Sequence, residues 1–258
     1  MTRIKNAFDN KKAFIGFVTA GDPSLEKTKE FVLQMEKAGA ALVELGIPFS
    51  DPIAEGPVIQ DANIRALSAG TTTDKVFELV RDIRKESEIP LVFLCYVNTL
   101  FRYGYDRFLT KCEEVGLDGL IIPDLPFEEK GELLEFTKAH NVDLITMIAP
   151  TSKERIREVS KEAEGFIYVV SSMGVTGVRN EITTDIRSMV SEIKNATDTP
   201  CCIGFGINTP AQVKEYTEYA DGAIVGSAIV RIVAEHGENA GEYIYKYVKE
   251  LSEAVCPV

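Results

Sequence analysis

Residues 41–57 read Ala41-Leu42-Val43-Glu44-Leu45-Gly46-Ile47-Pro48-Phe49-Ser50-Asp51-Pro52-Ile53-Ala54-Glu55-Gly56-Pro57. The first six residues form a short apolar run, and a loop rich in proline and glycine follows, which is typical of a buried strand and a turn. The run carries one carboxyl group, Glu44, which is costly to bury unless it is paired, solvated or used in chemistry. Because Asp51 and Glu55 lie on the following loop, the stretch predicts a candidate acid/base site.

Seven further short apolar runs occur along the chain. Nearly every residue in them is apolar, rather than every second one, which is typical of parallel strands buried on both faces. All eight predicted strands occupy residues 13–19, 41–46, 90–97, 119–122, 143–148, 166–170, 200–205 and 222–226. The segments between them have the period of amphipathic helices, at residues 25–37, 74–85, 105–114, 128–140, 153–162, 185–194 and 210–219.

This alternation within 258 residues predicts a (βα)8 barrel, also called a TIM barrel. An open doubly wound sheet is the alternative, and it is less favoured because no Gly-x-Gly-x-x-Gly sequence follows the first strand. No linker divides the chain, so we expect a single domain over residues 1–258. Residues 56–67 predict a short extra helix after the second strand. The chemistry of such barrels lies where strands end and loops begin, which is where Glu44 and Glu55 fall.

The amino-acid composition indicates which binding partners and which cellular compartment to expect. A net charge of −12 argues against nucleic acid, because phosphate backbones require a basic surface. The first residues lack the apolar core of a signal peptide, and no apolar run is long enough to span a membrane. The five cysteines are odd in number and form no Cys-x-x-Cys pair, so we expect a reducing cytoplasm. The only two histidines lie in polar segments, and we predict no metal site.

Glycine-bearing segments follow the last three predicted strands, at residues 174–177, 204–207 and 226–227. Glycines let backbone N–H groups approach a phosphate closely, and a helix that begins after such a segment adds partial positive charge. Loops at this end of a barrel commonly bind phosphate. We therefore predict a phosphate-ester site after strands 6, 7 and 8, formed by Gly177, Gly206, Gly226 and Ser227. No Walker A sequence is present, which argues against a nucleoside triphosphate.

Several of these motifs, in order, resemble the tryptophan synthase alpha subunit family. The resemblance covers nearly the whole chain and includes the acidic loop at residues 44–52, together with residues 21–23, 174–177, 204–207 and 226–230. It implies cleavage of indole-3-glycerol phosphate to indole and glyceraldehyde 3-phosphate, without a cofactor. It also implies docking onto a beta subunit, in an α2β2 assembly, that uses pyridoxal phosphate to convert the indole to L-tryptophan.

The resemblance assigns roles to two acids. Glu44 is implied as the general acid/base, which agrees with the raised pKa expected of a carboxyl group in an apolar wall. Glu55 is implied as the acid that accepts a hydrogen bond from the indole N–H, at a position where the family usually has aspartate. The structural alternative for Glu44 is a glutamate paired with a neighbouring arginine or amide. Asp51 is expected to bond within its loop or to contact the beta subunit.

The resemblance also implies an apolar indole pocket and a closing loop. The alternative for each pocket residue is a place in the barrel core, although Tyr168 needs a partner for its hydroxyl group. The implied substrate-binding residues are Phe17, Leu94, Tyr96, Tyr168 and Phe205, with Thr176 on the loop. Two other functions stay open: a sugar-phosphate isomerase or epimerase, and a catalytically weakened alpha-like protein that mainly activates a beta subunit.

Overall fold

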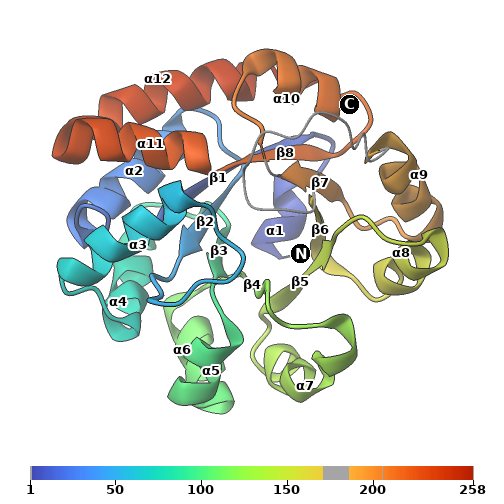
Figure 1. The fold of residues 1–258 in the computed structure, drawn as a ribbon, viewed down its shortest axis with the longest axis horizontal. Coiled ribbons are helices and arrows are strands. Elements are labelled where there is room, and N and C mark those ends of the chain that lie inside the picture. Colours follow the sequence, from blue (N-terminus) through green and yellow to red (C-terminus); the bar gives the residue numbers. More distant parts are fainter. Residues whose placement is uncertain (1, 171–185, 205, 258) are drawn as a thin grey trace.

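Eight parallel strands form a closed barrel in the order of the chain, from β1 to β8 and back to β1 (Figure 1). The computed structural model describes residues 2–170, 186–204 and 206–257. The predicted (βα)8 barrel is therefore confirmed. The strands are β1 (Ala13–Thr19), β2 (Leu42–Gly46), β3 (Leu91–Leu94), β4 (Gly119–Ile121), β5 (Asp143–Ile148), β6 (Glu164–Val170), β7 (Cys201–Gly204) and β8 (Gly222–Val225).

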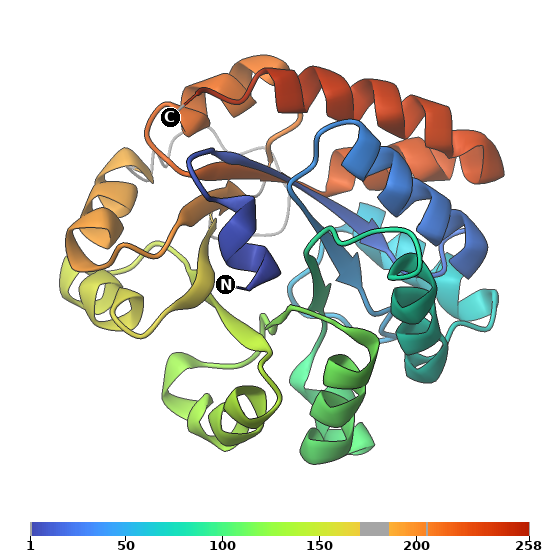
Figure 2. The same cartoon turned by 180° about the vertical axis from the view of Figure 1, so that it is seen from behind.

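Helices surround the barrel and cover the outer face of its strands (Figures 1 and 2). The extra helix predicted after the second strand is present as α3. The helices are α1 (Arg3–Ala7), α2 (Leu25–Lys37), α3 (Pro57–Ser68), α4 (Thr73–Ile83), α5 (Val97–Tyr103), α6 (Tyr105–Val115), α7 (Gly131–Ala139), α8 (Lys153–Ser160), α9 (Ile186–Ala196), α10 (Pro210–Thr217), α11 (Ser227–His236) and α12 (Ala240–Glu253), with short 3-10 turns η1 (Phe127–Glu129) and η2 (Gly237–Asn239). None of the helices in the described ranges is long and apolar enough to cross a membrane.

Local sequence accounts for where several helices begin. Ser24 accepts a hydrogen bond from the backbone N–H of Lys27 and so caps α2. Thr209 and Gln212 form a reciprocal capping box at the start of α10, with Pro210 in the first turn, where its missing N–H costs no hydrogen bond. Such caps satisfy backbone groups that the helix itself leaves without partners.

The core has an inner and an outer layer. Side chains inside the barrel include Ile15, Leu42 and Val92, whereas Val43 and Leu45 of β2 belong to the layer between strands and helices. Because successive side chains of a strand point to opposite faces, Glu44 is on the same face as Leu42, inside the barrel.

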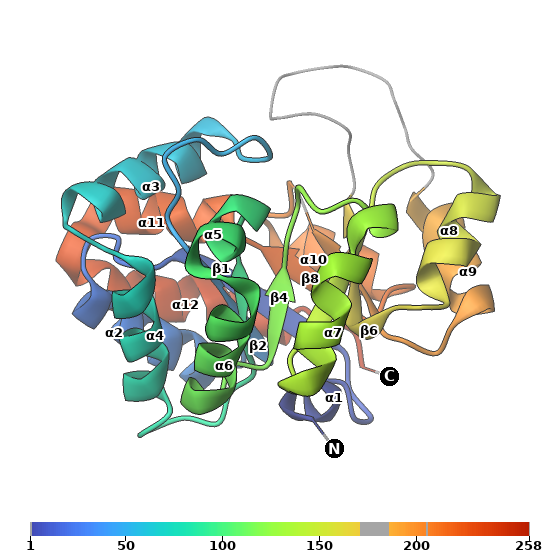
Figure 3. The same cartoon turned by 90° about the horizontal axis from the view of Figure 1, so that it is seen from below.

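The two ends of the barrel differ. Helix α1 lies at the end where the strands begin, and its Ile4 is fully buried among the inner-layer side chains. Figure 3 shows α1 at this end and the loop that precedes α3 at the opposite end. The carboxyl end is thus the open end, which is where the candidate site was expected.

The third strand is shorter than predicted. The apolar run was expected to continue as a strand to Val97, but β3 ends at Leu94, and Tyr96 is the residue before α5. The backbone N–H of Val97 donates instead to the carboxylate of Asp124 at 3.0 Å. This bond joins the start of α5 to the loop after β4, so the end of the apolar run begins a helix and does not extend the strand.

Candidate active site

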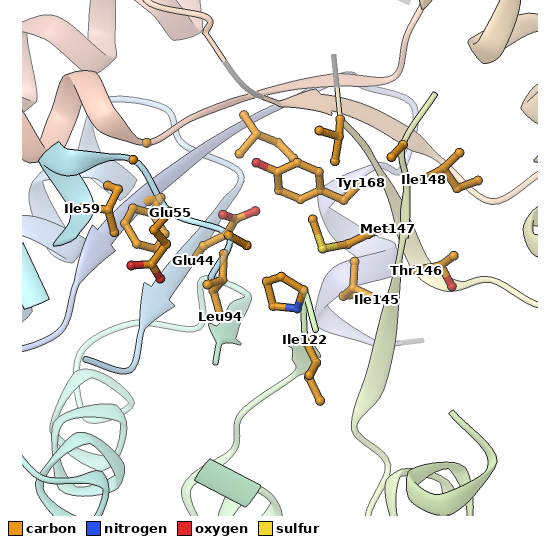
Figure 4. A pocket seen from close by; sticks show the side chains of 18 of the residues that line it. Glu44, Glu55, Ile59, Leu94, Ile122, Ile145, Thr146, Met147, Ile148 and Tyr168 are labelled. Carbon is orange, nitrogen blue, oxygen red and sulfur yellow. The ribbon is translucent and has the colours of Figure 1, made fainter. Parts of the chain in front are cut away.

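A cavity of about 880 Å³ opens at the carboxyl end of the barrel (Figure 4). Its walls come from strand ends, from the loops that follow them and from parts of helices α3, α8 and α11, and apolar side chains predominate. This volume is within the range of small-molecule sites, about 300–1,000 Å³. Eight of the predicted site residues line it together: Phe17, Glu44, Glu55, Leu94, Tyr168, Gly206, Gly226 and Ser227.

Glu44 is the most deeply buried acid of this cavity. The residue is 1% exposed, and its position in β2 is opposite Phe17 of β1 and Val92 of β3. Its Oε1 atom has no hydrogen-bond partner among the described residues. Burial raises the pKa of Glu44 from 4.5 to about 8, because the charged form has lost its hydration. At neutral pH the group is therefore mostly protonated and can both give and take a proton near that pH.

Glu55 lies on the loop between β2 and α3, on the other side of Glu44 from Tyr168 (Figure 4). Partial burial raises the pKa of Glu55, while hydrogen bonds from Asn63 and Tyr96 oppose that increase. The amide Nδ2 of Asn63 donates to Oε2 of Glu55 at 2.6 Å. The side chain is thus held by α3, the helix that begins two residues later.

The apolar wall contains most of the predicted pocket residues. Phe17 and Leu94 pack with Ile59 and Val230 beside the cavity. The ring of Tyr168 is buried next to the carboxyl group of Glu44 (Figure 4). Its burial raises the pKa of the Tyr168 hydroxyl, and the neighbouring charge of Glu44 raises it further, so the hydroxyl stays protonated.

Tyr96 has a different place from the one predicted. It does not line the cavity, and its hydroxyl oxygen accepts a hydrogen bond from the backbone N–H of Ala54 at 3.2 Å. Its ring stacks on Phe49, with centroids 5.1 Å apart. Tyr96 therefore supports the loop that carries Glu55. Two further predicted substrate-binding residues, Thr176 and Phe205, lie outside the described residues.

The predicted phosphate site is partly described. Gly206 has a φ of +76°, a conformation that glycine adopts without strain, and Gly226 immediately precedes α11. Ser227 is exposed and begins that helix, so its backbone N–H is among those without a partner inside the helix. Gly177 lies outside the described residues.

Sequence patterns did not identify several residues that the fold brings to this site. Arg231 lines the cavity one helical turn after Ser227, and that spacing of four residues on a helix was the available signal. Asn63 had no local signal, because a polar residue in an amphipathic helix is ordinarily assigned to the solvent face. Further apolar lining residues are Ile122, Ile145, Met147, Val170 and Ile224.

A closed parallel barrel with buried acids in a cavity at the carboxyl ends of its strands is the arrangement of a (βα)8-barrel enzyme. The family model for the tryptophan synthase alpha chain matches residues 4–255. The tryptophan synthase alpha chain of Lacticaseibacillus casei is 48% identical over 255 residues, which cover 99% of this chain and 96% of the relative. The chain belongs to the tryptophan synthase alpha chain family, and it is a lyase of tryptophan biosynthesis.

Solved structures agree with this assignment. The crystal structure of the tryptophan synthase alpha chain from Legionella pneumophila has a TM-score of 0.88 and 33% identity, covering 99% of this chain and 97% of that one. A chain from the tryptophan synthase α2β2 complex of Pyrococcus furiosus has a TM-score of 0.86 and 35% identity, covering 94% of this chain and 99% of that one.

Proposed function

We propose that the protein cleaves indole-3-glycerol phosphate to indole and glyceraldehyde 3-phosphate by a retro-aldol step, as an aldehyde-lyase that breaks a carbon–carbon bond. One observation supports this most directly. A buried carboxyl group, that of Glu44, lies in an apolar cavity large enough for a small molecule, and its Oε1 atom has no hydrogen-bond partner among the described residues. Because its pKa is raised to about 8, the carboxyl group of Glu44 is mostly protonated at neutral pH and can donate the proton that such a cleavage requires.

The proton transfers balance over one turnover. Glu44 begins protonated and gives its proton to indole C3, which places positive charge on the ring nitrogen. The resulting carboxylate then takes the proton of the glycerol hydroxyl next to the C3 bond. As that bond breaks, its electron pair returns to the indole ring, the hydroxyl carbon becomes the aldehyde, and Glu44 is protonated again.

Glu55 stabilises the charge that develops on the ring. Its carboxylate accepts a hydrogen bond from the indole N–H, and a negative group at this place lowers the energy of the cationic intermediate. The surroundings of Glu55 support this stabilising role. Burial raises its pKa, but the hydrogen bonds from Asn63 and Tyr96 favour its charged form.

The other end of the substrate is a phosphate monoester. We assign it to the backbone N–H groups at Gly206, Gly226 and Ser227, with Arg231 as a cation on the same cavity wall. Glycines allow this close approach, and the first N–H groups of α11 are not used within the helix. We propose no cofactor, because Glu44 and Glu55 provide the acid, the base and the stabilising charge.

We further propose that a tryptophan synthase beta subunit receives the indole in an α2β2 assembly. The Pyrococcus furiosus relative is described as part of such a complex. In this chain Ile53, on the loop that carries Glu55, is 76% exposed, and Phe101 of α5 is 71% exposed. Large apolar side chains this exposed at the open end of the barrel are suited to a protein interface. The five cysteines are all free, which is consistent with a cytoplasmic enzyme.

The test is indole release from indole-3-glycerol phosphate, with and without a beta subunit. We expect release by the wild-type chain, an increase when the beta subunit is present, and loss of at least about a hundredfold in Glu44→Gln. If no indole were released in either condition, the lyase proposal would be overturned. If the chain released no indole but raised the activity of a beta subunit, the weakened alpha-like alternative would replace it.

A further inference from the structure

Asn63 is a buried amide that points away from solvent. It lies in the middle of α3 and is 3% exposed, in a helix whose first residue follows the Glu55 loop. Its Nδ2 atom is 2.6 Å from Oε2 of Glu55. A buried amide that lacks a partner is costly, so this bond fixes both side chains. Asn63 takes no direct part in the proton transfers of the proposed reaction.

The backbone beside Glu55 is held as well. The Nε2 atom of Gln60 donates to the backbone oxygen of Glu55 at 2.8 Å. On the other side, the backbone N–H of Ala54 donates to the hydroxyl of Tyr96, and Tyr96 is itself stacked on Phe49. Both the main chain and the side chain of Glu55 therefore have fixed partners.

Helix α3 is in turn attached to the barrel. The guanidinium group of Arg65 donates to both carboxylate oxygens of Asp22 at 2.9 and 2.7 Å. Asp22 is 3% exposed and follows β1. Ala62 and Ala66, on the same helix, are fully buried. Asn63 thus occupies a position that the packing of α3 against the barrel determines, so it can fix the place of the Glu55 carboxylate.

From this geometry we propose that Asn63 is a positioning residue, which holds the Glu55 carboxylate at the indole end of the cavity through one amide hydrogen bond. The inference rests on the proposed lyase function and deepens it. Glutamate extends its carboxyl group about 1.5 Å further than aspartate and has one more rotatable bond. A partner at the far end of this longer side chain removes the freedom that the extra bond adds. Misplacement of a catalytic group such as this carboxylate by about 1 Å can lower the reaction rate about a hundredfold.

The bond also affects charge. An amide N–H that donates to a carboxylate favours the charged form, and Asn63 lowers the pKa of Glu55 against the raising effect of burial. When the amide is removed, Glu55 is expected to hold its proton to a higher pH. The acidic limb of the pH–rate profile should therefore shift to higher pH. The loss of a purely structural contact would not cause such a shift.

The test is a double-mutant cycle on indole release, with Asn63→Ala and Glu55→Ala. We expect Asn63→Ala to lower kcat about tenfold or more in the wild-type background, with a smaller change in KM. In the Glu55→Ala background, the same change should lower kcat by less than about twofold, because the residue acts through Glu55. Equal losses in the two backgrounds would overturn the proposal.

Two further variants separate positioning from packing. Asn63→Asp keeps the size of the side chain but replaces the donor with an acceptor, so it should be at least as impaired as Asn63→Ala. Recovery of wild-type kcat by Asn63→Asp would show that only volume matters and would contradict the proposal. Ser68→Ala, at the exposed end of α3, is the matched control and should behave as wild type.

A separate measurement distinguishes failure of this inference from failure of the lyase proposal. Carbon-13 NMR can follow the titration of the Glu55 carboxyl group without substrate. We expect its midpoint to move to higher pH in Asn63→Ala, whether or not the chain releases indole. Indistinguishable titrations in the wild type and Asn63→Ala would refute the positioning role, even if the wild-type enzyme were active.

Discussion

Replacing Glu44 by glutamine should stabilise the fold above pH 5, by an amount that grows with pH. Glutamine has nearly the shape of a protonated glutamate but cannot ionise. In the folded protein, burial raises the pKa of Glu44 to about 8, against 4.5 when the group is in water. The stability associated with the protonated carboxyl group is therefore fully present below pH 4.5 and is lost as the pH rises through about 8.

The size of the effect follows from that difference. Each pH unit between the two pKa values costs the wild-type fold about 1.4 kcal/mol. We expect Glu44→Gln and the wild type to have similar free energies of unfolding at pH 4.5. The variant should be more stable by about 3 kcal/mol at pH 7 and by about 5 kcal/mol at pH 9.

Urea unfolding followed by circular dichroism at several pH values between 4.5 and 9 measures this difference directly. Glu135→Gln is the matched control, because Glu135 is an exposed glutamate on α7 and should give a pH profile parallel to that of the wild type. If the difference between Glu44→Gln and the wild type were the same at every pH, the carboxyl group would not be buried and protonated as described.

Three other outcomes are expected. The indole-release rate at saturating substrate should fall above about pH 8 as Glu44 loses its proton; a rate still rising at pH 9 would contradict its role as the acid. Arg231→Ala should raise KM about tenfold with little change in kcat, because it removes a cation from the phosphate end; steady-state kinetics at varied substrate concentration would show this, and an unchanged KM would exclude Arg231 from the site. Gly204→Ala would place a Cβ atom 2.4 Å from the Tyr168 hydroxyl and should destabilise the protein by about 1–3 kcal/mol; an unchanged urea midpoint would mean that Tyr168 can move aside.

The sequence was most informative about the strands. Runs such as residues 13–19 and 143–148 coincide with β1 and β5, because burial on both faces leaves few polar residues in a parallel strand. Prediction was least reliable where the end of an element depends on distant groups. Strand β3 was predicted to end three residues too late, and the part of the run beyond it includes Val97, whose backbone N–H donates to Asp124 on another loop.

Some features of the candidate site were likewise predictable from the sequence, and others depend on distant groups. The position of Glu44 in an apolar strand already indicated a buried acid, because strand periodicity fixes which face a side chain takes. Whether that acid is paired was left open by the sequence, and only the fold leaves its Oε1 without a partner among the described residues. The sequence alone also could not place Tyr96 behind the Glu55 loop.

The sequence by itself thus predicted the barrel, the extra helix after the second strand and two candidate acids, Glu44 and Glu55, because hydrophobic pattern and motif are local features of the chain. Only the tertiary structure decided what surrounds each acid. Asn63 is eight positions from Glu55 on a different element, and the two side chains meet because α3 packs back against the barrel. Burial and hydrogen bonding, which set the pKa of a carboxyl group, depend on neighbours that are brought close by folding and not by sequence.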